Sequence, residues 1–228
     1  TATDAMDVVV TDNEDPTITA SVDVAANTDD DGSGDCTVAV AITDATFSDN
    51  CTGSVLTWSM TGAVTATGTG QVGTYTFPIG TTTITYTVTD GSSRTATDAM
   101  DVVVTDNEDP TITASVDVAA NTSDDASGDC TVDIAITDAT FSDNCTGSVL
   151  TWEMSGAVTA TGTGQVGTYT FPIGTTTITY TVTDGSSRTA TEEMDVVVTD
   201  NEDPTITASS DVAANTSDDA SGDCTVDI

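Results

Sequence analysis

The chain has 228 residues, with 38 Asp and Glu against 2 Lys and Arg, no His, and a formal net charge of −36. Because Lys and Arg bind phosphates, this balance excludes nucleic acid as a partner and argues against direct contact with an anionic membrane. Without His, catalysis would have to rely on carboxylates, hydroxyls or thiols, and no motif indicates an enzyme.

The sequence repeats with a period of 94. The stretch TATDAMDVVVTDNEDP begins at Thr1 and again at Thr95, with a near copy at Thr189, so that 95 − 1 and 189 − 95 both equal 94. A period of this size fits one small domain per repeat. It predicts the last strand of a preceding repeat over 1–11, complete domains over 15–105 and 109–199, and the start of a third repeat over 203–228.

Alternation of apolar and polar residues predicts strands throughout each repeat. No amphipathic helix is predicted, and turn residues such as Asp90-Gly-Ser-Ser93 separate the strands. Seven or eight short strands at this spacing favour an all-β immunoglobulin-like sandwich. The predicted inner faces are Cys130, Val132, Ile134 and Ile136; Leu150, Trp152 and Met154; Ile178, Tyr180 and Val182; and Met194, Val196 and Val198, with Trp58 and Tyr86 in the core of the earlier repeat.

Cysteine spacing predicts one disulfide inside each repeat. Cys36 and Cys51 are 51 − 36 = 15 positions apart, as are Cys130 and Cys145, whereas the partner of Cys224 would fall at position 239, outside the chain. Closing a loop of about 15 residues is worth about 3 kcal/mol in the loop-entropy model. A structural disulfide also indicates an oxidising, extracytoplasmic compartment.

Several motifs resemble the HYR (hyalin repeat) family. The motifs are FPIGTTTITYTVTD at 77–90, DCTV at 35–38, SDNC at 48–51 and VVVTDNEDPTI at 102–112. The resemblance implies an immunoglobulin-like sandwich associated with adhesion, and similar tandem arrays occur in long secreted surface adhesins, including gliding-type adhesins of Bacteroidetes. The family often joins its first and last strands by a second cysteine pair. Here those positions are Ala20 and Asp98, and Ala114 and Glu192.

Acidic clusters recur at the domain junctions. In an immunoglobulin-like topology the junction acids 106–109 lie beside the preceding loop 29–35 and the following loops around 143 and 184. Such a cluster repels itself unless a cation occupies it, and Ca²⁺ takes six to eight oxygen ligands. The candidate ligands are Asp12, Asn13, Glu14, Asp15, Asp49, Asn50, Asp90, Asp106, Asn107, Glu108, Asp109, Asp143, Asn144 and Asp184, with a second candidate site at Asp29, Asp31 and Asp35. The alternative is a solvated acidic surface.

These features predict a structural segment of an extracellular, cell-surface adhesin. The predicted stalk or filament is stiffened by interdomain Ca²⁺ and by one disulfide per repeat. Its partners are the neighbouring repeats of the same chain, and an unknown surface ligand is reached through other domains. Two alternatives remain open: a calcium-dependent module that binds a glycan or a protein, and a filament that assembles from several chains.

Overall fold

The computed structural model describes residues 1–29, 34–123 and 129–213. Within these ranges the ordered elements are all β-strands, and no helix long and apolar enough to span a bilayer occurs there. The strands form two sandwich units, which we call the first unit (β1–β9) and the second unit (β10–β18). The all-β, immunoglobulin-like sandwich expected from the sequence is therefore confirmed.

The first unit packs a five-stranded sheet, in the order β2-β9-β8-β5-β6, with the strand pairs β3-β7 and β1-β4. β2 runs parallel to β9, and the other pairings are antiparallel. The strands are β1 (Thr17–Thr19), β2 (Val24–Asn27), β3 (Thr37–Ala41), β4 (Thr46–Ser48), β5 (Val55–Gly62), β6 (Ala66–Thr69), β7 (Thr74–Pro78), β8 (Gly80–Thr89) and β9 (Thr95–Thr105).

The second unit repeats this topology, with the order β11-β18-β17-β14-β15 in its larger sheet. Residues 106–110 connect it to the first unit. Its strands are β10 (Thr111–Thr113), β11 (Val118–Asn121), β12 (Thr131–Ala135), β13 (Thr140–Ser142), β14 (Val149–Gly156), β15 (Ala160–Thr163), β16 (Thr168–Pro172), β17 (Gly174–Thr183) and β18 (Thr189–Thr199).

The predicted inner faces form the core of each unit. Ile178, Tyr180 and Val182 on β17 are fully buried, as are their first-unit counterparts on β8. Trp58 and Trp152 are partly buried and pack against the two cores, as expected. One inner-face assignment is wrong: Cys130 is exposed, because β12 begins only at Thr131.

The predicted strand at residues 1–11 is not formed. Residues 1–16 are extended and carry no strand, although the copy of this segment at Thr95–Thr105 is β9. The difference follows from pairing, because β9 lies between β2 and β8, whereas no described strand pairs with segment 1–11. Its assignment to a preceding repeat, like the boundaries of the two complete domains, stays a prediction.

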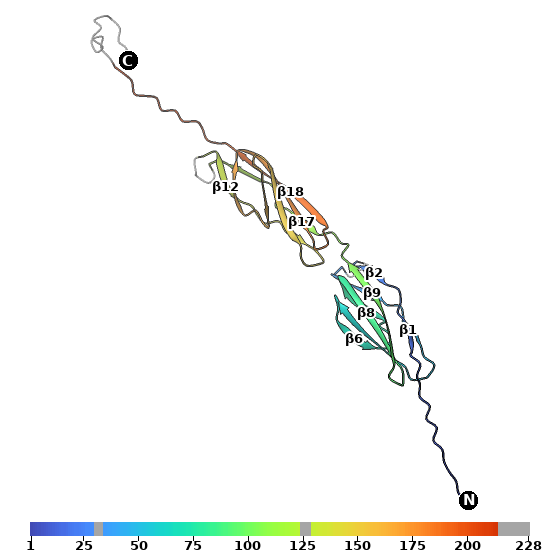
Figure 1. Ribbon diagram of the computed structural model, residues 1–228. Helices are drawn as coiled ribbons and strands as arrows, with labels where there is room; N and C mark the ends of the chain where they lie inside the picture. Colours follow the sequence, from blue (N-terminus) through green and yellow to red (C-terminus); the bar gives the residue numbers. More distant parts are fainter. Residues whose placement is uncertain (30–33, 124–128, 214–228) are drawn as a thin grey trace.

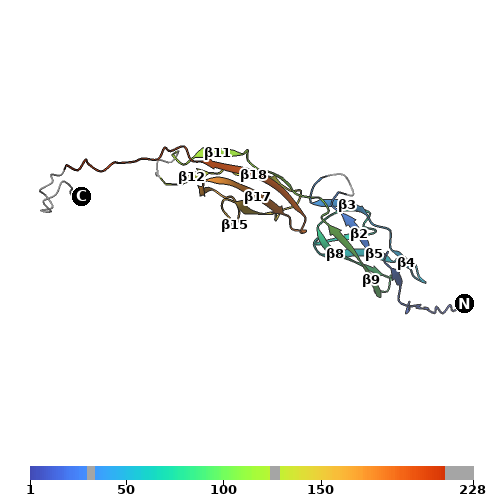
Figure 2. The ribbon, with the colours of Figure 1, turned by 90° about the horizontal axis from the view of Figure 1, so that it is seen from above.

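The two units lie end to end, and the segments before β1 and after β18 leave an elongated molecule at opposite ends (Figures 1 and 2). Each unit has two poles, set by the pairing of β8 with β9 or of β17 with β18. The β8–β9 turn at 90–94 lies at the N-terminal pole, and the end of β9 at Thr105 lies at the C-terminal pole. At about 3.3 Å per residue, strands of this length span about 33–36 Å.

The positions that carry a second cysteine pair in the HYR pattern are neighbours in the first unit. The Ala20 amide donates a hydrogen bond of 2.9 Å to the Asp98 carboxylate, which links the end of β1 to β9. A polar contact therefore links these two positions.

Gly68 should be intolerant of any side chain. A Cβ there would lie 2.3 Å from Cζ2 of Trp58, its cross-strand partner. We expect Gly68→Ala to displace the indole and destabilise the first unit by about 1–3 kcal/mol. Urea unfolding followed by Trp58 fluorescence, in a Trp152→Phe background, measures this. Gly91→Ala is the control, because a Cβ there meets only an ordinary contact at 3.7 Å.

Tyr86 and Tyr180 predict a pH dependence of stability. Burial raises the pKa of each phenol, and neither hydroxyl has a hydrogen-bond partner. Their contribution is therefore complete below the unfolded pKa near 10 and is lost as the pH rises through the higher folded pKa. We expect Tyr86→Phe to leave stability at pH 7 unchanged or raised by about 1 kcal/mol, and to shift alkaline unfolding of the first unit upward.

Thermal melts at pH 7 and above pH 10 check this expectation. Tyr75→Phe is the control, because Tyr75 is only partly buried. A clear loss of stability at pH 7 in Tyr86→Phe would show that the hydroxyl makes a favourable contact.

Candidate metal centre at the junction

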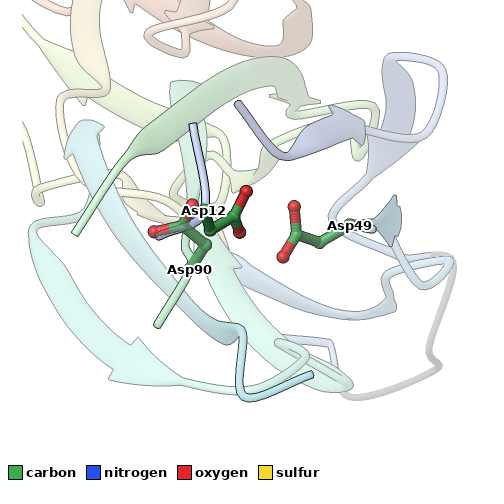
Figure 3. A group of neighbouring side chains, drawn as sticks. All are labelled: Asp12, Asp49 and Asp90. Carbon is green, nitrogen blue, oxygen red and sulfur yellow. The ribbon is translucent and has the colours of Figure 1, made fainter. Parts of the chain in front are cut away.

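Three carboxylates from three separate segments meet where the units join. Asp106 lies in the connecting segment, Asp143 follows β13, and Asp184 follows β17; one oxygen from each lies within 4.8 Å of the other two. We call this group the junction cluster. The equivalent residues Asp12, Asp49 and Asp90 converge in the same way at the N-terminal pole of the first unit, and we call them the polar-end cluster (Figure 3).

Local turns hold one oxygen of each carboxylate in the junction cluster. Asp184 Oδ1 accepts hydrogen bonds of 2.8 Å from the amides of Ser186 and Arg188, in the β17–β18 turn. Asp106 Oδ1 accepts from the amide of Glu108 at 3.1 Å. Asp143 Oδ2 accepts from the Cys145 amide at 3.3 Å. Asp residues favour such turns because their side chains bond to the backbone two residues on. The same bonds fix the direction of each carboxylate.

The second oxygen of each carboxylate is buried without a hydrogen-bond partner. These oxygens are Asp106 Oδ2, Asp143 Oδ1 and Asp184 Oδ2. Asp106 is only 7% exposed and Asp184 only 5%. The adjoining Asn107 and Asn144 also have buried side-chain oxygens without partners. Buried polar atoms are normally satisfied, so these oxygens are available to bind a ligand.

The protein has no spare cationic side chain for this cluster. Its two arginines already form ion pairs, Arg94 with Asp15 at 2.5 Å and Arg188 with Asp109 at 2.7 Å. Two like charges about 4 Å apart repel each other by roughly 4 kcal/mol at an effective dielectric constant of 20. Burial raises the pKa of Asp143, and the nearby charges of Asp106 and Asp184 raise it further. The oxygens suit a hard cation such as Ca²⁺.

The polar-end cluster differs in its surroundings. The Glu14 amide, which donates to Asp12 at 3.1 Å, lowers the pKa of Asp12. Cys51 is a free, exposed thiol beside it, and its hydrogen bond with Asp12 raises the pKa of the thiol. In the junction cluster the equivalent cysteine, Cys145, is oxidised. The two clusters therefore have equivalent carboxylates, but the cysteine beside them is a free thiol in one and part of a disulfide in the other.

The predicted disulfides inside each repeat are wrong. The structure joins Cys36 of the first unit to Cys145 of the second, with Cα atoms 4.8 Å apart, and leaves Cys51 and Cys130 as exposed thiols. The reason is the path of the chain. Cys36 precedes β3 at the C-terminal pole, and Cys51 lies beside Asp12 at the N-terminal pole. Cysteines that far apart cannot be bridged. Cys224 lies outside the described residues.

Two hydrogen bonds cross the junction beside the disulfide. The Asn144 amide group donates to Thr28 Oγ1 at 3.3 Å and to the backbone oxygen of Asp35 at 3.4 Å. Thr28 is fully buried and donates in turn to Asp106 Oδ1 at 3.3 Å. A pocket lined by Ile79, Gly80, Val104, Thr105, Asp106 and Ser186 lies at the same junction. The connecting segment is therefore held from both sides.

The other predicted ligands have different environments. Asp15 and Asp109 are engaged in ion pairs, and Asn13, Glu14 and Asn50 are exposed, whereas Glu108 is only partly exposed. At the second candidate site, Asp29 is exposed, Asp35 accepts hydrogen bonds from Thr37, and Asp31 lies outside the described residues. Among the described acids, groups of three form only in the two clusters.

Thr28 and the two arginines were not predicted as site residues from the sequence. Thr28 bonds both Asp106 and Asn144, and its counterpart Thr122 bonds Asp200 at 3.5 Å. The signal was available in the sequence, because Arg94 and Arg188 are the only cationic side chains and both follow the same turn. Thr28 carried no such signal among so many threonines.

Comparison with known proteins gives matches at the level of structure alone. No family model matches the chain, and no curated protein matches it, so the resemblance to the HYR family stays a prediction.

Three similar structures come from extracellular or modular β-proteins. Protocadherin gamma B2 cadherin domains 3–6 match at 15% identity and a TM-score of 0.39, over 83% of this chain and 52% of that one. Mouse cadherin-23 EC22-24 matches at 17% and 0.35, over 82% and 65%. The fibronectin(III)-like modules of Clostridium thermocellum CbhA match at 15% and 0.31, over 85% and 100%. The chain thus spans about half of the protocadherin structure.

Replacing Thr28 tests whether it supports the junction. Thr28→Val keeps the side-chain shape and removes the hydroxyl that bonds Asp106 and Asn144. One hydrogen bond is worth about 1 kcal/mol, so we expect the Glu108 amide to exchange its hydrogen about fivefold faster. Hydrogen exchange followed by NMR measures this. In the control, Thr122→Val, the change should be confined to residues around Glu202, whose amide bonds Asp200.

Proposed function

We propose that this chain is a segment of an extracellular stalk, in which a divalent cation, Ca²⁺, locks each unit to the next. One observation carries the proposal: buried, unpartnered oxygens of Asp106, Asp143 and Asp184 converge at the junction, in a protein whose two cationic side chains are engaged elsewhere. A bound cation offsets the repulsion and fixes the connecting segment to the second unit.

The shape of the molecule supports a structural role. The units lie end to end, and five connecting residues, 106–110, separate their nearest strands. Pro110 is buried, and Asp109 is tied to Arg188 of the second unit. A short, anchored connection limits bending, so such units in series extend over a distance without folding back. The disulfide fits a secreted protein on the cell surface.

The resemblance to HYR repeats extends this proposal. Tandem arrays of that kind occur in long secreted surface adhesins, including gliding-type adhesins. We place this chain in the stalk of such an adhesin, with neighbouring repeats as its partners and the ligand-binding part in other domains.

Calcium titration tests the cation site. We expect Ca²⁺ to raise the unfolding temperature, and Asp106→Asn or Asp184→Asn to weaken binding about tenfold or more, measured by isothermal calorimetry. In EDTA, Asp106→Asn should be as stable as the parent protein or more stable, because it removes one repelling charge. Asp138→Asn is the control: it makes the same charge change at an exposed site in the same unit. Equal binding by Asp106→Asn and Asp138→Asn would reject the site.

Small-angle scattering tests whether a bound cation limits bending at the junction. Because the disulfide also restrains the junction, the comparison needs the parent protein and Cys36→Ser/Cys145→Ser, each in Ca²⁺ and in EDTA. We expect the double variant to be extended in Ca²⁺ and flexible in EDTA. Identical profiles in both solutions would remove the cation from the stalk and leave the acids as a solvated surface.

A second candidate, lateral binding, rests on two exposed aromatic residues. Phe47 on β4 and Phe141 on β13 are 41% and 40% exposed, beside the short pairs β1-β4 and β10-β13. Such rings suit contact with a protein or glycan, or with a second chain. Sedimentation in Ca²⁺ distinguishes these functions, because a stalk segment stays monomeric and a laterally assembling filament does not.

A further inference from the structure

We propose that the cysteines of this repeat form a series of covalent staples between neighbouring units, which carry tension past the folded domains. This inference deepens the proposed stalk function, on which its biological role rests. It rests on different atoms from the cation site and can fail separately from it.

The geometry gives each unit one cysteine for each neighbour. Cys36 lies at the C-terminal pole of the first unit and Cys51 at its N-terminal pole. Where the two units meet, Cys36 at the C-terminal pole of the first unit is bonded to Cys145 at the N-terminal pole of the second. The two cysteines are 109 sequence positions apart. Cys51 and Cys130 lie at the two poles without a described neighbouring unit, and both are exposed thiols. One pairing rule therefore accounts for all four described cysteines.

The C-terminal pole of the second unit has the same hydrogen bonds as the C-terminal pole of the first. Asp200 accepts hydrogen bonds from Thr122 and from the Glu202 amide, as Asp106 does from Thr28 and from the Glu108 amide. Cys130 lies at this pole, just before the start of β12. The pole thus reproduces the first unit's side of the junction, including its cysteine.

Each staple forms by oxidation of two thiols. Two Cys–SH groups lose two protons and two electrons and gain one S–S bond, while a disulfide oxidant such as oxidised glutathione is reduced to two thiols. The poles bring the correct pair together, so no rearrangement of the folded units is required.

The staple changes the path that tension takes. A pull on the two ends of the chain passes from Cys36 directly to Cys145, so residues 37–144 bear no load. This bypassed stretch contains β3–β9, the connecting segment and β10–β13. Repeated along an array, the covalent path within a unit runs only between its two cysteines, 145 − 130 = 15 positions apart. At about 3.5 Å per residue, that path is at most about 50 Å long, whereas 94 residues could extend to roughly 330 Å.

Trypsin provides a direct test of the pairing. Arg94 and Arg188 are its only cleavage sites, and they separate Cys36 and Cys51 from Cys130 and Cys145. The oxidised protein is treated with N-ethylmaleimide, denatured, digested without reductant and analysed by mass spectrometry. We expect fragments 1–94 and 95–188 to remain covalently joined, with one maleimide on Cys51 and one on Cys130. Separate fragments, each carrying its own disulfide, would overturn the proposal.

A duplicated repeat tests the series. With a second copy of residues 95–188 inserted after Arg188, we expect the first three tryptic fragments to stay joined through two disulfides. Cys130→Ser in this longer protein should release only the inserted copy from the other two, whereas Cys51→Ser should release none. Release of every fragment, or a link at one junction alone, would contradict the series.

Force spectroscopy tests the mechanical function. Reduction should lengthen the fully unfolded chain by the 109 positions that separate Cys36 from Cys145, about 380 Å at about 3.5 Å per residue. Two disulfides of 15 positions each would release only about 100 Å. The measurement is made in Ca²⁺ and in EDTA. A gain of about 380 Å in both supports the staple whatever the outcome for calcium, and a gain near 100 Å, or none, rejects it.

Discussion

The long antiparallel pairing of β8 with β9 determines most of what this chain can do. It runs from Thr89 opposite Thr95 to Gly80 opposite Val104, and it is repeated in β17 and β18. Its buried side, Ile84, Tyr86 and Val88, makes the centre of the core. Its two ends define the poles, with Asp90 in the turn at one and Asp106 just past the other. Asp106 and Asp184 at the junction take their places from these hairpins, because the end-to-end contact joins unlike poles.

The protein's own side chains and amides neutralise or hydrogen-bond only part of the negative charge at the junction. Arg188 neutralises Asp109, and turn amides hold one oxygen each of Asp106, Asp143 and Asp184. The exposed ion pair contributes little by itself, since such pairs are worth about 0–1 kcal/mol. The remaining charges are close and buried, so what binds there decides how firmly the connecting segment is held. A disulfide beside these carboxylates adds a restraint that does not depend on ions, and the two restraints act on the same few residues.

The fold could be predicted because the alternation of apolar and polar residues along each strand is a local pattern in the sequence. Alternation along Thr177–Thr183 and Met194–Val198 gives the buried faces of β17 and β18, and it is confirmed at Tyr180 and Val196. The grouping of Asp106 with Asp143 and Asp184 also followed from topology and repeat spacing. The disulfide could not be predicted in this way. Sequence spacing favoured Cys51 as the partner of Cys36, whereas the answer depends on which pole each cysteine reaches and on how two units meet, and neither is a local property. The exposure of Phe47 and Phe141 is not a local property either. It depends on strand pairing, because β4 and β13 pair only with three-residue strands.

The placement of Cys36 and Cys51 also sets an order of events in biogenesis. As the chain emerges from its N-terminus, Cys51 follows Cys36 by 15 positions, whereas the native partner Cys145 follows by 109. An unfolded repeat exposed to oxidant therefore closes the short loop first, since loop closure becomes less favourable with length. Once β3 and β4 have folded, that wrong loop is out of reach. Folding of each unit before oxidation therefore favours the pairing of Cys36 with Cys145. In this chain, the tertiary structure determines which cysteines can form a disulfide.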